Sequence, residues 1–142
     1  MNSNAGLTTL TGGAGRDIFV VGTQSSGISV YTTITDFGNG DTLTLKDKGT
    51  ETFSATKVTL AATATLADYA NQVVVNGGDT SSNGKIGWFQ FGGNTYVVQG
   101  MHDATTTASF VNGTDQIVQL TGLVDLSNVV FAAGTGGSIT FG

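Results

Sequence analysis

The sequence predicts an all-β fold class, in which a short parallel β-roll leads into a β-sandwich-like domain with one short helix. The 142 residues include 22 glycines and no proline, and 39% are hydrophobic, which is too apolar for a disordered chain. Short alternating stretches rich in Thr and Val end at glycine turns. A nine-residue repeat near the N-terminus is typical of stacked parallel strands.

The charge balance argues against several classes of function. A net charge of −5 with only five Lys and Arg residues cannot neutralise a nucleic-acid backbone or hold an anionic membrane surface. Without cysteine, the chain has no disulfide, thiolate zinc site or cysteine nucleophile. No apolar run approaches the roughly 20 residues of a membrane helix, and any export signal is expected elsewhere than in an N-terminal leader. We therefore expect no nucleic-acid partner and no membrane insertion.

Two consecutive nonapeptides form the repeat. Ser3–Thr11 reads SNAGLTTLT, and Gly12–Val20 reads GGAGRDIFV. Each carries glycine in its first half and an apolar residue in its second half, so loop and strand alternate as in a parallel β-roll. The matching places are Gly6 with Gly15, Thr8 with Asp17, and Leu10 with Phe19.

The other elements follow from alternation, caps and turn residues. A helix is expected after Thr65, because Asp68 three residues later completes a capping box and apolar residues at helical spacing, including Tyr69, run up to Asn76 and Gly77. We assign residues 1–48 to the end of the roll and residues 49–142 to a β-rich C-terminal domain. The predicted strands are Asp17–Val21, Ile28–Phe37, Thr42–Leu45, Phe53–Leu60, a hairpin of Lys85–Phe91 with Thr95–Gln99, Asp115–Thr121, Val129–Ala132 and Ser138–Phe141.

The nonapeptide and the loop DFGNGD together predict a calcium site. Glycines let backbone carbonyls turn inward, and calcium prefers six to eight oxygen ligands. One such loop supplies half a coordination shell, and a second loop stacked on it supplies the rest. The competing interpretation is a plain glycine turn; a phosphate cradle is disfavoured because no helix follows Gly15. The expected ligands are Gly12, Gly13, Gly15, Asp17, Asp36 and Asp41.

Other residues give weaker signals. His102 is the only histidine, no GxSxG elbow occurs, and we predict a protein that is not an enzyme. The remaining acidic residues are scattered and are expected only to solubilise the chain. Aromatic residues around the hairpin fit a sandwich core better than a sugar-binding platform. The residues in question are Asp47, Glu51, Asp68, Asp79 and Asp125 among the acids, and Trp88, Phe89, Phe91, Tyr96 and Phe110 among the aromatics.

Gly12–Ser127 resembles a family of exported bacterial proteins. GGAGRDIFV followed by TITDFGNGDTLTL resembles the end of the RTX β-roll in serralysin-type proteases and related type I secretion substrates. GKIGWFQFGGNTYVVQ and SFVNGTDQIVQLTGLVDLS are similar to the C-terminal tails of RTX-type S-layer proteins. The zinc-protease motif HExxH is absent, so protease activity is not implied.

The resemblance implies a structural and export module of a secreted S-layer protein. It implies calcium-dependent folding outside the cell, an uncleaved C-terminal signal for the type I secretion machinery, and an extracellular, cell-surface location. Self-association in a surface lattice is the expected partnership. Two alternatives stay open at this point: the non-catalytic tail of a secreted RTX enzyme such as a serralysin-type protease, or an adhesin or glycan-binding module that uses the aromatic hairpin.

Overall fold

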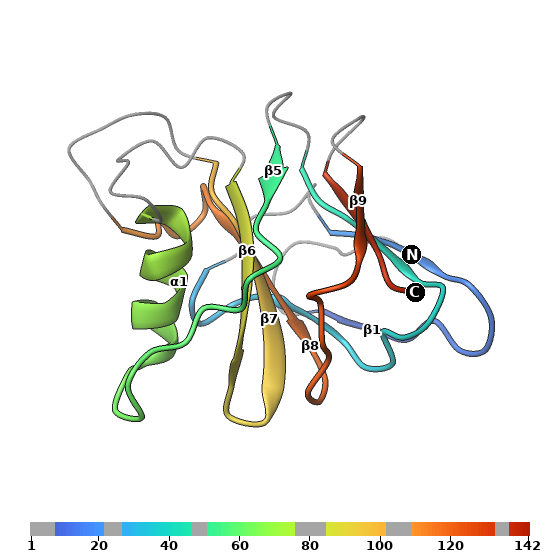
Figure 1. Cartoon of the computed structure of the whole chain (residues 1–142), viewed down its shortest axis with the longest axis horizontal. Helices are drawn as coiled ribbons and strands as arrows, with labels where there is room; N and C mark the ends of the chain where they lie inside the picture. Colours follow the sequence, from blue (N-terminus) through green and yellow to red (C-terminus); the bar gives the residue numbers. More distant parts are fainter. Residues whose placement is uncertain (1–7, 22–26, 47–50, 76–84, 102–108, 133–136) are drawn as a thin grey trace.

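The computed structural model describes residues 8–21, 27–46, 51–75, 85–101, 109–132 and 137–142. This part is mostly β, with two mixed sheets of six and four strands and one short helix, which confirms the predicted all-β class. The helix, the larger sheet and the smaller sheet follow one another as three layers (Figure 1). The strand order is β1-β3-β8-β7-β6-β5 in the larger sheet and β2-β4-β10-β9 in the smaller one.

The strands are short except for the hairpin. Their bounds are β1 Thr9–Leu10, β2 Ile18–Val20, β3 Thr32–Ile34, β4 Thr42–Thr44, β5 Thr52–Phe53, β6 Lys85–Phe91, β7 Asn94–Gln99, β8 Gln116–Leu120, β9 Val130–Ala132 and β10 Ser138–Thr140, with α1 at Leu66–Val75.

Residues 9–20 and 32–44 form two stacked layers of chain, which we call the first and second coils. Strand β1 pairs in parallel with β3, and β2 pairs in parallel with β4. The same offset of 24 residues separates Thr11 from Thr35, whose hydroxyls lie 2.6 Å apart. Each coil therefore contributes one strand to each sheet, and a turn connects its two strands.

The hairpin and the helix form where local signals predict them. Gly92 and Gly93 have φ values of 59° and 85°, a backbone that favours glycine at both central residues of a tight hairpin turn. At the helix N-terminus, the Thr65 amide donates to Asp68 Oδ2 at 2.9 Å, and the Asp68 amide donates to Thr65 Oγ1 at 3.2 Å. This reciprocal pair is the predicted capping box, and α1 packs against β6 and β7.

The main core lies between the two sheets. Phe19, Leu43 and Ile139 are fully buried on the inner face of the smaller sheet, and Ile34 and Leu120 face them from the larger one. A second apolar cluster joins α1 to the opposite face of the larger sheet. Both sheets contain strands from residues 1–48 and from residues 49–142.

Two predicted strands are shorter than expected. In Ile28–Phe37, only Thr32–Ile34 pairs as a strand, apart from an isolated bridge between Gly27 and Val30. In Phe53–Leu60, strand β5 ends at Phe53 and a single bridge at Val58 follows. Alternation was present in both segments, but extended pairing needs a neighbouring strand along the whole length.

Among the described residues, no helix has the length and apolar character of a membrane span.

Candidate functional site

The predicted ligands all lie in the turns of the two coils. Residues 11–17 form the first turn, between β1 and β2, and residues 35–41 form the second turn, between β3 and β4. Because both strand pairs keep the same offset, the first turn lies on the second. The structure therefore brings the two predicted half-sites together, and we call the pair the turn stack.

Asp36 connects the turns through both of its carboxylate oxygens. The Gly12 amide donates to Oδ1 at 2.9 Å, and the Gly13 amide donates to Oδ2 at 2.7 Å. These two N–H groups lower the pKa of the exposed Asp36 carboxyl below its ordinary value, because they stabilise its charged form. Asp36 thus acts as an acceptor that fixes the start of the first turn.

Asp41 makes an equivalent connection at the other end of the turns. Its Oδ1 accepts from the Asp17 amide at 2.9 Å, and its Oδ2 accepts from the Gly38 amide at 2.9 Å. The side chain is only 4% exposed, so these charge-assisted bonds also satisfy a buried carboxylate. One bond joins the two turns, and the other closes the second turn on itself.

Asp17 differs from the other two carboxylates. Its Oδ2 is buried and has no hydrogen-bond partner. A buried, unsatisfied carboxylate oxygen is costly, and such an atom calls for a cation or another donor that completes it. Among the atoms of the turn stack, Asp17 Oδ2 is the best candidate for a metal ligand.

Position 12 requires glycine because a side chain there would collide with Asp17. A Cβ built there would lie 2.5 Å from Asp17 Oδ2, so the glycine leaves the room that this carboxylate occupies. Gly15 is needed for conformation, because its φ of 116° is one that side-chain-bearing residues rarely adopt. The nonapeptide pattern therefore has a steric basis beside any ligand.

The oxygen donors fit calcium in kind, although they do not form a cluster of acidic side chains. Within the described ranges, no three His, Cys, Asp or Glu side chains gather as a metal site. Asp36 and Asp41 use their oxygens on N–H donors, but each carboxylate oxygen keeps a second lone pair. Calcium accepts single carboxylates together with carbonyls and water, so Asp17 would lead a mixed oxygen shell here.

The aromatic side chains around the hairpin are core residues. Trp88 is 2% exposed, and its indole N–H donates to the Ala55 carbonyl at 3.0 Å. A hollow of about 590 Å³ lies beside it, but the indole offers no open face for stacking on a sugar. Phe89 and Tyr96, which point to the other side of the sheet, are buried as well. The core interpretation is confirmed.

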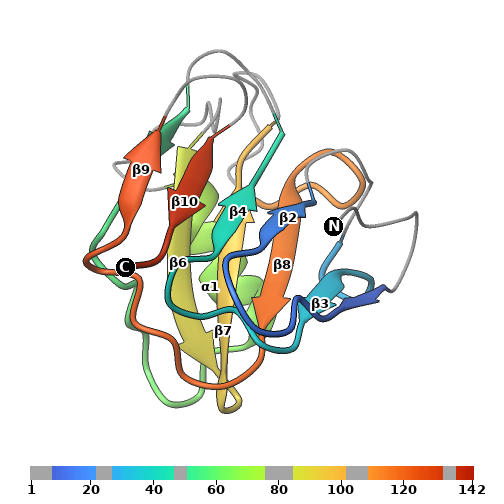
Figure 2. The same ribbon diagram turned by 90° about the vertical axis from the view of Figure 1, so that its right-hand side faces the viewer.

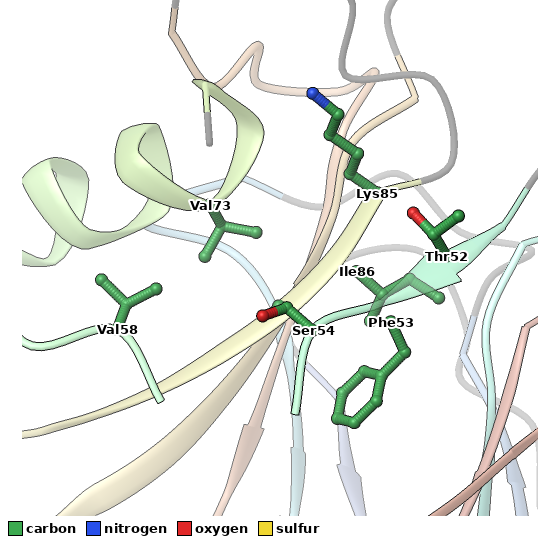
Figure 3. A pocket seen from close by; sticks show the side chains of 8 residues that line it. Thr52, Phe53, Ser54, Val58, Val73, Lys85 and Ile86 are labelled. Atoms are coloured by element: carbon green, nitrogen blue, oxygen red, sulfur yellow. The ribbon is translucent and has the colours of Figure 1, made fainter. Parts of the chain in front are cut away.

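A second hollow lies between α1, β5 and β6. Its volume is about 180 Å³, below the roughly 300 Å³ at which small-molecule sites begin. Val58 and Val73 line one side, and the Lys85 side chain extends away from them (Figure 3). With few convergent polar groups, this hollow is a packing defect beside the helix rather than a site.

The burial of two acidic side chains was not predicted from the sequence. Glu51 was expected to solubilise the chain, and this was wrong because its side chain is 4% exposed. Asp115 is fully buried and accepts from the Met101 and Val111 amides at 2.6 and 2.8 Å. No side-chain pattern marks either residue, because their partners are set by chain folding. Several residues of the sequence analysis lie outside the described residues. These are His102, Asp47, Asp79 and the Ser3–Thr8 loop except for Thr8.

Compared with known protein families and curated proteins, the chain matches no family model and no curated sequence.

Proposed function

We propose that this chain is a non-catalytic structural module of a secreted bacterial surface protein, and that calcium stabilises it at the turn stack. The observation that carries the proposal is Asp17 Oδ2, a buried carboxylate oxygen without a hydrogen-bond partner in the first of two turns held in register. Calcium satisfies such an oxygen without a proton, and millimolar calcium is available outside the cell.

The turn stack divides its carboxylates between two tasks. Asp36 and Asp41 hold backbone amides and keep the turns aligned without a metal. Asp17 is left to bind the cation. An ion that binds only the folded stack adds its binding free energy to folding, about 2.7 kcal/mol when calcium is at 100 times its Kd. Low calcium in the cytosol removes this contribution before export.

The wider assignment follows the RTX resemblance. In it, the chain is the calcium-stabilised β-roll end and C-terminal module of an S-layer protein, is exported by type I secretion machinery, and stands in a lattice at the cell surface. The buried aromatic side chains speak against the glycan-binding alternative, because the stacking face that such a module needs is covered.

A calcium titration of the EDTA-stripped protein tests the site. The readout is the thermal unfolding midpoint, followed by Trp88 fluorescence, with magnesium as the control ion. We expect calcium to raise the midpoint of the unchanged protein and to leave that of Asp17→Asn where it is. Asp125→Asn is the matched control, since Asp125 is exposed and its hydrogen bonds come from the hydroxyl and the amide of the nearby Ser127, outside the turn stack. An equal rise in Asp17→Asn would remove the proposed site.

A further inference from the structure

One asparagine side chain joins the turn before β8 to the chain before β3. The two strands pair in parallel and lie side by side in Figure 2. Asn112 precedes β8, and its Oδ1 accepts a hydrogen bond at 3.0 Å from the amide of Ile28, 84 positions away in the sequence. A Cβ at Gly27 would lie 2.8 Å from the same oxygen, so this glycine makes room for the side chain.

The residue after Asn112 is Gly113, and both are exposed. Their turn is closed by the Thr114 and Asp115 amides, which donate to the Val111 carbonyl at 3.1 and 2.9 Å. Within the described part of the chain, neither the Gly113 amide nor Asn112 Nδ2 donates a hydrogen bond. The ends of the turn are therefore held, while no such bond fixes the peptide plane between its two central residues.

An asparagine followed by glycine is able to modify itself. The glycine nitrogen attacks the side-chain carbon Cγ and gives up its proton, the bond from Cγ to Nδ2 breaks, and ammonia leaves. Glycine favours this step because no Cβ obstructs the approach of its nitrogen. Water then opens the five-membered succinimide to aspartate or to isoaspartate, in which the main chain runs through Cγ. The reaction is intramolecular and needs water as its one co-reactant.

The hydrogen bond with Ile28 assists the attack at Asn112. Negative charge develops on Oδ1 as the Gly113 nitrogen adds to Cγ. An N–H group that is already directed at this oxygen stabilises the developing charge, as the donors of an oxyanion hole do. Because Nδ2 is open to water, it can take up a proton and leave as ammonia.

The second turn of the turn stack contains the same dipeptide in a protected form. Asn39 is exposed, and Gly40 has a φ of 94°, close to the 82° of Gly113. However, the Gly40 amide donates to the Phe141 carbonyl at 2.7 Å. This bond fixes the peptide plane and the proton that the attack must remove, so the reaction at Asn39 first requires local opening.

We propose that Asn112 is a site of spontaneous deamidation in the folded protein and that Asn39 is protected. The isoaspartate product adds a backbone carbon to the turn of residues 111–115 and places one more negative charge on a chain of −5. It thereby loosens the connection between this turn and Ile28. The proposal rests on hydrogen bonding around two asparagines, and it depends neither on calcium nor on the proposed function.

Peptide mapping after incubation of the unchanged protein at neutral pH tests the proposal. Trypsin places Asn39 in peptide 17–46 and Asn112 in peptide 86–142, while the other two asparagine–glycine pairs of the sequence fall in peptide 58–85. Mass spectrometry detects the replacement of the amide NH2 by OH, fragmentation assigns the residue, and chromatography separates isoaspartate from aspartate.

In the folded protein, we expect Asn112 to be converted at least roughly tenfold faster than Asn39. In denaturant, the two should react at similar rates. Equal rates in the folded protein would overturn the proposal. A difference that persists in denaturant would also overturn it, because local sequence and not the hydrogen bonding of the fold would then be the cause.

Asn112→Gln supplies a second measurement. Glutamine would have to close a six-membered ring, which forms far more slowly, so the conversion at this position should disappear. Incubation should lower the thermal unfolding midpoint of the unchanged protein more than that of Asn112→Gln, because the isoaspartate product loosens the turn. An equal loss in both proteins would contradict the proposed effect on the contact with Ile28.

Discussion

The turn stack and the hairpin with its helix are held together by different forces. In the hairpin region, Phe89 is fully buried between Tyr69 and Tyr96, with ring centroids 4.8 and 5.4 Å away. In the turn stack, strands of two or three residues are joined by carboxylate bonds between turns that lie 24 residues apart. One region depends on local pairing and apolar burial, and the other depends on long-range polar contacts, which the proposed calcium ion would reinforce.

The largest effect should come from the apolar region. Phe89→Ala removes the middle ring of the stack, and we expect it to lower the free energy of unfolding by about 3–5 kcal/mol, measured by denaturant titration. The loss should be the same with and without calcium, because the ring lies in the cluster under α1. A calcium-dependent loss would mean that the two regions are not separable in this way.

Asp41→Ala should be the most damaging change in the turn stack. It leaves the Asp17 and Gly38 amides without their acceptor and should cost roughly 2–3 kcal/mol in the same titration. Asp41→Asn keeps one acceptor oxygen, so its free energy of unfolding should lie between that of Asp41→Ala and that of the unchanged protein. If Asp41→Ala unfolded at the same denaturant concentration as the unchanged protein, the carboxylate would not hold the turns together.

Gly12→Ala tests the space around Asp17. The new Cβ would meet Asp17 Oδ2 at 2.5 Å, so the carboxylate must shift, at a cost of about 1–3 kcal/mol and with a weaker calcium response. Gly38→Ala is the matched control in the second turn, since its Cβ would have its nearest neighbour at 3.7 Å. Similar losses in both variants would remove the special role of Gly12.

The smallest effect concerns Tyr31, which directly precedes the second coil and contacts Tyr96 of the hairpin. Burial, followed by its hydrogen bond and charge interaction with Tyr96, raises the pKa of Tyr31 from 10.0 to about 12. The neutral phenol therefore stabilises the fold below pH 10, and this contribution is lost as the pH rises through about 12. Tyr31→Phe should flatten the alkaline limb of stability between these values. Phenolate absorbance follows the ionisation itself. An alkaline limb of stability that stays unchanged in Tyr31→Phe would contradict this assignment.

The sequence predicts most of the fold where the signals are local. The capping box at Thr65 and Asp68 and the paired glycines of the hairpin are each read from a few adjacent residues, and both form as predicted. The sequence also predicts that the two glycine-aspartate turns lie next to each other, and the parallel pairs β1–β3 and β2–β4 align them at one offset of 24 residues.

The use of each carboxylate could not be read from the sequence. Asp17, Asp36 and Asp41 look alike in the pattern, but the register of the parallel strands directs backbone amides to Asp36 and Asp41 and leaves Asp17 Oδ2 without one. Asp115 is a comparable case, because its amide donors come from Met101 and Val111, outside the adjacent strand β8. Side-chain patterns carry no information about which amides a folded loop will present.

Residue-resolved amide hydrogen exchange with and without calcium tests most directly whether calcium acts locally at the turn stack. We predict that calcium slows exchange at the Gly12, Gly13 and Asp17 amides more than at the hairpin amides of Tyr96 and Val97, which slow only through the added stability of the whole fold. The first group lies in the turn stack and the second in the apolar region. Equal slowing in both regions, or none in the turns, would contradict a local calcium site led by Asp17.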